Sequence, residues 1–201
     1  MARRSEHSLE EIKEMVLSAA ETIVVEDGFG ALKVRQIAME IGYTVGSIYM
    51  VFENMGDLIT HLKARTLDDI AVELDKVITN DADPQEQLIA LSKAYANFAN
   101  QHFNRWSMIF EHRSTNDAAL PDWYQQKINE IFKRVEVLFK QLAPQSTQQQ
   151  QQQAAQALWS GIHGVCQLSL TGKLEAVGEN NTGKTVLLLA ENFIKGWQQI
   201  E

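Results

Sequence analysis

Apolar side chains recur at intervals of three and four residues along almost the whole chain, and this spacing constrains the fold more than any other feature. It is the period of an amphipathic α-helix, in which residues three and four positions apart share one face. We find no convincing alternation of apolar and polar residues of the kind that marks a half-buried β-strand. The sequence therefore predicts an all-α protein, with helix boundaries near Ser8, Gly28, Asn54, Asn80, Pro84, Pro121, Pro144, Ser146 or Thr147, Gly172 and Glu201.

Local signals support several of these boundaries. Ser8 and Glu11 have the spacing of a capping box, in which the two residues satisfy each other's backbone amides at a helix start. Gly28 is suited to end that helix, and Pro84 suits the first turn of a later one. Residues 148–153 are all glutamine. They could form a disordered linker, but we favour the first turns of a helix because glutamine is a good helix former.

The composition is that of a globular protein rather than a disordered or membrane-spanning one. The chain has 201 residues, of which 45% are hydrophobic and 22% are charged. No apolar run approaches the roughly 20 residues that a membrane-spanning helix needs. Cys166 is the only cysteine and cannot form an internal disulfide. We therefore expect a cytoplasmic protein that does not enter a membrane.

Residues 33–51 have the pattern of a helix-turn-helix. Two short apolar-periodic segments are separated by Gly42-Tyr43-Thr44. Gly42 can adopt the left-handed backbone that ends the first helix, and Thr44 can cap the second. Such a pair places its second helix in the major groove of DNA in many regulators. The pattern alone is also compatible with a purely structural pair of short helices.

A longer stretch carries a resemblance to a known family. It contains, in order, Glu26-Asp27-Gly28-Phe29, Val34-Arg35-Gln36-Ile37-Ala38, Ile41-Gly42-Tyr43-Thr44-Val45-Gly46-Ser47-Ile48-Tyr49, Phe52 and Leu58. This run of about fifty residues resembles the DNA-binding region of the TetR family of bacterial repressors. The resemblance implies a helix-turn-helix head over residues 1–53. It also implies a bundle of roughly six helices over 54–201, which would bind a small-molecule effector and a second copy of the chain.

The resemblance also implies which residues would bind an operator in double-stranded DNA. Hydroxyl groups of the recognition segment would reach phosphates, its other side chains would face base edges or thymine methyl groups, and Gly46 would allow close approach to the backbone. Basic residues outside this segment would add phosphate or minor-groove contacts. The expected set is Arg3, Arg4, Lys33, Thr44, Val45, Gly46, Ser47, Tyr49 and Met50. Phe52 is expected to be a core residue.

Charge departs from what a DNA-binding head usually carries. The whole chain has a net charge of −8, and residues 1–65 hold seven basic and ten acidic side chains. No Lys or Arg lies between Gln36 and Leu62, and Met55 stands where the family usually has a phosphate-binding lysine. We expect weak non-specific binding with a shallow salt dependence. The alternative is a TetR-like ligand-binding scaffold that has lost DNA binding.

The later part of the chain suggests an effector site. The segment Trp159-Ser160-Gly161-Ile162-His163-Gly164 resembles a motif of one TetR branch, and Trp159 and His163 share a helix face. We favour the alternative that these two residues are core, with the imidazole hydrogen-bonded. An apolar or aromatic effector is expected, with the candidate ligand residues Asn97, Trp106, Phe110, His112, Trp159 and His163. The spacing of histidines and Cys166 suggests neither a metal site nor a catalytic pair, and we expect no cofactor.

Wide apolar faces in the last two predicted helices suggest a homodimer interface. Its expected residues are Leu158, Ile162, Val165, Leu187, Ala190, Phe193, Ile194 and Trp197. Two such helices from each subunit would make a four-helix interface. The alternative is that these side chains are buried within one subunit.

Residues 178–185 match the phosphate-binding pattern G-x-x-x-x-G-K-[ST] in full. In a nucleotide-binding enzyme, Lys184 would contact the terminal phosphate and Thr185 would hold magnesium. That function needs a preceding strand and a parallel sheet, which the helical periodicity does not provide. We therefore interpret residues 178–185 as a loop between helices, with Thr182 capping the last helix, and expect no enzyme activity.

Overall fold

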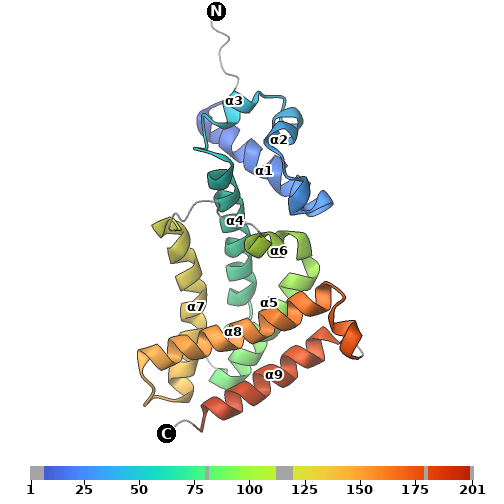
Figure 1. Ribbon diagram of the computed structural model, residues 1–201. Coiled ribbons are helices and arrows are strands. Elements are labelled where there is room, and N and C mark those ends of the chain that lie inside the picture. Colours follow the sequence, from blue (N-terminus) through green and yellow to red (C-terminus); the bar gives the residue numbers. More distant parts are fainter. Residues whose placement is uncertain (1–6, 80–81, 112–119, 179–180, 200–201) are drawn as a thin grey trace, which may run out of the picture. The chain divides into compact units, whose positions relative to one another are not determined.

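The computed structural model describes residues 7–79, 82–111, 120–178 and 181–199. Within these ranges the chain forms nine α-helices, two short 3₁₀ turns and no strand (Figure 1). This confirms the all-α prediction. The contacts divide the protein into two compact units. Unit 1 comprises the described residues of Met1–Thr66 and Asn104–Leu120, and unit 2 those of Leu67–Phe103 and Pro121–Glu201.

Unit 1 is built around helix α1 (Leu9–Asp27). The predicted capping box is present, since the amide of Glu11 donates to the Ser8 hydroxyl and the amide of Ser8 to the Glu11 carboxylate. Gly28, at φ +80°, ends the helix and donates its amide to the Val24 carbonyl. The buried side of α1 packs on α2 (Val34–Glu40), α3 (Val45–Ile48) and the first turns of α4 (Met55–Asp75). This cluster is the core that orders the two short helices.

The turn between α2 and α3 adopts the predicted helix-turn-helix backbone. Gly42 has φ +71°, a left-handed value that glycine adopts without steric cost. The next amide, of Tyr43, donates to the carbonyl of Ala38 at 3.0 Å. Ile37 and Ile48 are completely buried on either side of the turn. Local glycine chemistry and apolar burial therefore act together to fix the angle between α2 and α3.

The expected division at residues 53/54 differs from the two units in the structure. Leu58 and Leu62 of α4 are buried in the unit 1 core, as is Met108 of α6 (Phe103–Glu111). Asn104 donates its side-chain amide to the Val25 carbonyl at the end of α1. Arg105 forms an ion pair with Glu21 at 3.0 Å. The head is therefore completed by segments distant in sequence, and these add buried apolar surface to a core that α1 and two short helices alone would leave small.

Unit 2 consists of the rest of α4 with α5 (Pro84–Gln101), α7 (Asp122–Leu142), α8 (Gln148–Leu170), the 3₁₀ turn η2 (Leu174–Val177) and α9 (Thr182–Trp197). Helices α8 and α9 lie side by side and both pack on α5 (Figure 1). Two ion pairs join α7 to α4, Arg134 with Asp75 at 2.7 Å and Lys127 with Asp68 at 2.5 Å. The side-chain nitrogen of Trp197 donates to the carbonyl of Phe139, which fixes the end of α9 on α7.

The caps and turns of the structure can be compared with three predictions about where helices begin and end. The glutamine run 148–153 is helical, and Thr147 and Gln150 form a capping box at its start. The prediction that Thr182 caps the last helix is wrong, because the Asn181 side chain accepts from the Lys184 amide and Thr182 is already helical. The predicted end of α4 near Asn80 is also wrong. The helix ends at Asp75, where a Val77-to-Leu74 hydrogen bond tightens the chain into a turn.

Among the described residues, no helix combines the length and the apolar character needed to cross a membrane.

Candidate nucleic-acid interface and effector region

The recognition segment is a four-residue helix, α3, whose start is held by Thr44. The Ser47 amide donates to the Thr44 hydroxyl oxygen at 3.2 Å, and the two side-chain hydroxyls lie 2.9 Å apart. A hydroxyl can accept a capping bond and still donate its own proton. The cap therefore leaves the Thr44 O–H able to reach Ser47 or a phosphate.

The other candidate DNA-binding residues differ in accessibility. Met50 and Tyr49 are 68% and 42% exposed, so both can contact a partner from this surface. Val45 is partly buried and packs against the unit 1 core, which leaves it less available for base contact than the sequence suggested. Phe52, 2% exposed, is a core residue as predicted. Lys33 is exposed at the start of α2, whereas Arg3 and Arg4 lie outside the described residues.

Met55 is not a substitute for the lysine that the family carries at its position. It packs against the unit 1 core together with other partly buried apolar residues. The start of α4 is capped instead by Asn54, whose side-chain oxygen accepts from the Asp57 amide at 3.0 Å. The Asp57 carboxylate accepts in turn from the Glu53 amide. This helix start is therefore satisfied internally and carries negative charge.

In unit 2, a polar contact lies within an aromatic cluster. The Tyr95 hydroxyl and Nδ1 of His163 are 3.1 Å apart, and burial lowers the pKa of His163 below its ordinary value. The Trp159 ring stacks on the His163 ring at 5.2 Å, and Phe132 of α7 meets Trp159 edge-on at 5.5 Å. Sequence reasoning missed Tyr95 as the partner of His163. The available signal in the sequence was a tyrosine on the apolar face of a helix, since a buried phenol normally finds a hydrogen-bond partner.

Five of the six predicted ligand residues are described, and they are divided between the two units. In unit 2, Trp159 and His163 lie together on α8, and Asn97 lines a groove with Phe98 and Val77. Trp106 is completely buried in unit 1, where it packs edge-on against the 40% exposed Phe110. His112 lies outside the described residues.

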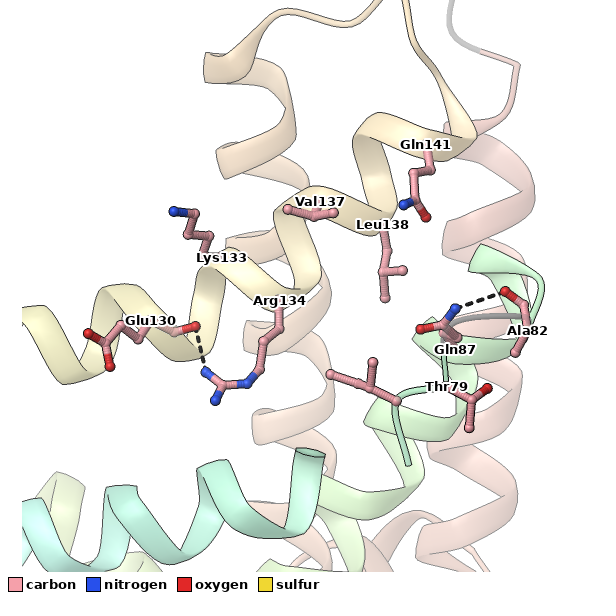
Figure 2. Close-up of a pocket in the computed structure, with 10 residues that line it drawn as sticks. Thr79, Ala82, Gln87, Glu130, Lys133, Arg134, Val137, Leu138 and Gln141 are labelled. Carbon is pink, nitrogen blue, oxygen red and sulfur yellow. Dashed lines mark hydrogen bonds between the residues drawn. The ribbon is translucent and has the colours of Figure 1, made fainter. Parts of the chain in front are cut away.

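A second groove in unit 2, of about 570 Å³, lies between α7 and the segment that joins α4 to α5 (Figure 2). Its apolar lining includes Ile78, Leu138 and the 45% exposed Val137. Arg134, at its edge, donates to Asp75 and to the Glu130 carbonyl, so its charge is already neutralised. Hydrogen bonding from Arg134 lowers the pKa of Asp75. Neither groove is lined by Trp159 or His163.

Comparison with known proteins decides the family. The profile of the Tetracyclin repressor-like C-terminal domain matches residues 88–188, half of the chain. The profile of the bacterial regulatory proteins of the tetR family matches residues 16–62, which contain the helix-turn-helix. The chain belongs to the TetR family. It is a DNA-binding transcriptional regulator of that family.

Individual relatives agree with this assignment. The chain is 28% identical to the fatty acid metabolism regulator protein of Bacillus subtilis over 119 residues, an alignment that spans 59% of each protein. A protein of unknown function from Rhodococcus sp. RHA1 has a similar structure, with a TM-score of 0.76, 17% identity and 98% of both chains covered. A TetR-like transcriptional regulator from the same organism gives a TM-score of 0.62 at 18% identity, covering 96% of this chain and 98% of the other. At these identities the two structures show the fold alone.

The expected dimer residues of this TetR-family chain fall into two groups. Five of them, Leu158, Ile162, Ala190, Ile194 and Trp197, are buried within the single chain. Burial within one subunit describes these five residues, because the same chain already covers their apolar surface. Val165, Leu187 and Phe193 are only partly buried. On the same two helices Leu168 and Leu188 are 44% and 64% exposed, and these two were not among the expected residues.

The phosphate-binding pattern lies where a helix begins. Thr182, Gly183, Lys184 and Thr185 form the first turn of α9. The described residues before the pattern belong to α8 and the turn η2, not to a strand. A nucleotide-binding loop of this type requires a strand that leads into it. The arrangement matches the interpretation of a loop between helices, and the family is one of transcriptional regulators.

Proposed function

We propose that this protein is a ligand-responsive repressor that binds its operator as a homodimer in the cytoplasm and leaves it when a small apolar or aromatic effector binds. The observation that carries the proposal is α3, a capped helix ordered by the unit 1 core and followed directly by the exposed Tyr49 and Met50. Two such helices in a dimer would enter successive major grooves, about 34 Å apart. Phosphate contacts would come from Lys33 and from the arm that holds Arg3 and Arg4.

The effector would bind in unit 2, at the aromatic cluster of Trp159, His163, Tyr95 and Phe132. Effector sites are mostly apolar and contain a few polar groups that orient the ligand, and the Tyr95–His163 pair supplies such groups. Helix α4 continues from unit 1 into unit 2 and could transmit the change. The effector must bind the DNA-free form more tightly than the DNA-bound form, since a ligand with equal affinity for both shifts nothing.

The partner subunit would pack on the faces of α8 and α9 that remain exposed. Leu168 and Leu188 lie there with the partly buried Val165, Leu187 and Phe193. We expect Leu188→Glu to convert a dimer into a monomer in sedimentation equilibrium, because burying an unpaired charge in an apolar interface is costly. Val72→Glu, at an exposed residue of α4, is the matched control and should remain dimeric. A monomeric wild-type protein, or a dimeric Leu188→Glu variant, would contradict this interface.

The central experiment selects bound fragments from a library of random DNA duplexes at low and moderate salt. The wild-type protein should enrich one palindromic site, and Tyr49→Ala should fail to enrich it. A panel of apolar and aromatic compounds is then tested for release of that site. It includes long-chain fatty acids, because one relative is a fatty acid metabolism regulator. A compound that binds tightly but leaves operator affinity unchanged is not the effector, and a panel without any releasing compound contradicts the ligand response.

A second candidate function is a TetR-like scaffold that binds a ligand but binds DNA weakly or not at all. Two observations favour it, the excess of acidic over basic side chains in residues 1–65 and the packing of Met55 into the core. The same selection separates the two functions. Absence of enrichment at either salt concentration, with a compound still binding to unit 2, supports the scaffold.

A further inference from the structure

The groove between α7 and the segment that joins α4 to α5 has an apolar wall that a ligand can bury. All of its described lining residues belong to unit 2, and none of them belongs to the aromatic cluster. Its volume of about 570 Å³ is within the range of about 300–1,000 Å³ that is usual for small-molecule sites. Ile78, Val137 and Leu138 form the wall, and Val137 is 45% exposed.

One polar side chain that lines the groove is almost completely buried. Gln87, in the first turn of α5, is 7% exposed, and its side-chain nitrogen donates to the Ala82 carbonyl at 2.8 Å. This bond decides how the amide is oriented, because exchanging its two ends would place one oxygen against another. The Gln87 oxygen must therefore face away from Ala82. Figure 2 shows it directed into the groove, on the side of Leu138.

Within the described part of the chain, the Gln87 oxygen accepts no hydrogen bond. A buried amide carbonyl normally has a partner, because an unsatisfied acceptor in apolar surroundings is costly. The oxygen is not one of the fully enclosed atoms that lack a partner, so it can be reached from the groove. An O–H or N–H group that enters beside Leu138 would supply the missing donor.

The charged groups at the groove cancel one another. Arg134 is paired with Asp75 at 2.7 Å, and the other two charged lining residues, Glu130 and Lys133, have opposite signs. Figure 2 shows both of them away from Gln87, toward the other end of the groove. An ionic head placed against Gln87 would lose its water without gaining a counter-charge, which is unfavourable. An uncharged head that donates one hydrogen bond avoids this cost.

We propose that this groove is a second ligand site, which binds an uncharged aliphatic molecule. The polar end of the molecule donates a hydrogen bond to the Gln87 oxygen, and its chain packs on Ile78, Val137 and Leu138. The site goes beyond the proposed function, because its lining is separate from the aromatic cluster. It binds its ligand whether or not the protein binds DNA or responds to an effector.

NMR of the full chain, labelled at its methyl groups, tests the site with four small probes. The methyl groups of Ile78, Val137 and Leu138 report the groove, and the indole N–H of Trp159 reports the aromatic cluster. The first probe is 1-octanol. Heptyl methyl ether is an isomer of 1-octanol that has no O–H, so it isolates the contribution of the donor. Octanoate and octylammonium attach a similar chain to an anion and to a cation.

Two variants separate the acceptor from the apolar wall. Gln87→Leu removes the oxygen and keeps a side chain of similar size. Val137→Trp fills the groove from an exposed position and leaves the Gln87 amide in place. Val72→Trp makes the same change at an exposed residue of α4 that does not line the groove, and it is the matched control. Thermal unfolding verifies that each variant is folded. If Gln87→Leu does not fold, the two isomers and Val137→Trp still decide the result.

The site predicts a specific pattern of affinities. 1-Octanol should shift the three groove methyl groups of the wild-type protein to saturation. The ether should bind about 3- to 10-fold more weakly, the range for one hydrogen bond, and both ions should also bind more weakly than the alcohol. In Gln87→Leu the alcohol and the ether should bind equally. Val137→Trp should bind neither, and Val72→Trp should bind both as the wild type does.

Each other outcome overturns the site. Equal binding of the two isomers to the wild type, or a preference that persists in Gln87→Leu, would show that the oxygen does not hold the ligand. Tighter binding of either ion would show that the groove selects a charge. Saturable shifts confined to Trp159 would place the alcohol at the aromatic cluster. Shifts that never saturate, shifts that survive in Val137→Trp, or no shifts at all would show that the groove is not a ligand site.

Discussion

Replacing Thr44 by alanine should loosen the recognition helix, and the structure gives the magnitude. The hydroxyl of Thr44 caps a helix of only four residues, in which Ile48 alone is buried. Loss of an N-cap threonine costs about 1 kcal/mol, and here few other contacts can compensate. The expected result is a melting temperature lower by about 2–4 °C for a chain of this size. Thr44→Ser keeps the hydroxyl and should remain close to the wild type.

Amide hydrogen exchange resolves the effect along the chain. A loss of about 1 kcal/mol corresponds to roughly fivefold faster exchange for amides that open locally. The acceleration should be confined to residues around Ser47 and absent from α8. DNA affinity is measured in parallel, because the same hydroxyl can donate to a phosphate. Affinity should fall in Thr44→Ala and recover in Thr44→Ser.

The reasoning fails in a recognisable way. If Thr44→Ala leaves both melting temperature and exchange unchanged, the cap contributes nothing to the helix. A loss of affinity without any loss of stability would then assign the hydroxyl to DNA contact alone. If Thr44→Ser behaves like alanine, the threonine methyl group rather than the hydroxyl is what matters.

Three further predictions concern unit 2. Burial lowers the pKa of His163 from its ordinary 6.5, so protonation favours the unfolded chain and stability should fall as the pH drops below about 6.5. Between pH 7.5 and 5.5, the melting temperature of His163→Gln should therefore fall less than that of the wild type. Equal falls in the two proteins would contradict this. The pKa of the buried Cys166 thiol is raised to about 11, so alkylation at pH 8 should require denaturant, and rapid reaction of the native protein would show that the site opens. A Cβ at Gly161 would lie 2.9 Å from Cδ2 of Leu189, whereas one at Gly164 would meet nothing within 4 Å. Gly164→Ala should therefore gain up to about 1 kcal/mol of helix propensity, and Gly161→Ala should lose most of that gain to overpacking, a difference visible in their melting temperatures.

Features that depend on neighbours within a few residues could be predicted from the sequence. The Ser8–Glu11 capping box, the left-handed Gly42 and the helical glutamine run are of this kind. Each is decided by hydrogen bonds between residues three or four positions apart or by the backbone preference of one residue. The helix-turn-helix and the family follow, because the motif is a continuous stretch of the chain.

The errors at helix ends also have a local cause. Both Asn181 and Thr182 can cap α9, and periodicity does not distinguish two adjacent capping residues. The apolar pattern continues past Asp75 through Val77, although the backbone has already turned. A periodic pattern identifies the face of a helix well and its last residue poorly.

The amino-acid sequence by itself determined that this protein is all-helical, that residues 33–51 form a helix-turn-helix and that the chain resembles TetR regulators. Only the tertiary structure decided that His7 meets Tyr43, 36 residues away, that Tyr95 meets His163, 68 residues away, and that Met108 completes the core of the head. It also decided that Leu158 and Ile162 are buried within one chain. Helical periodicity states which face of a helix is apolar, but not which helix covers it. That choice is made by the angles and distances at which whole helices pack, and no local stretch of sequence contains them.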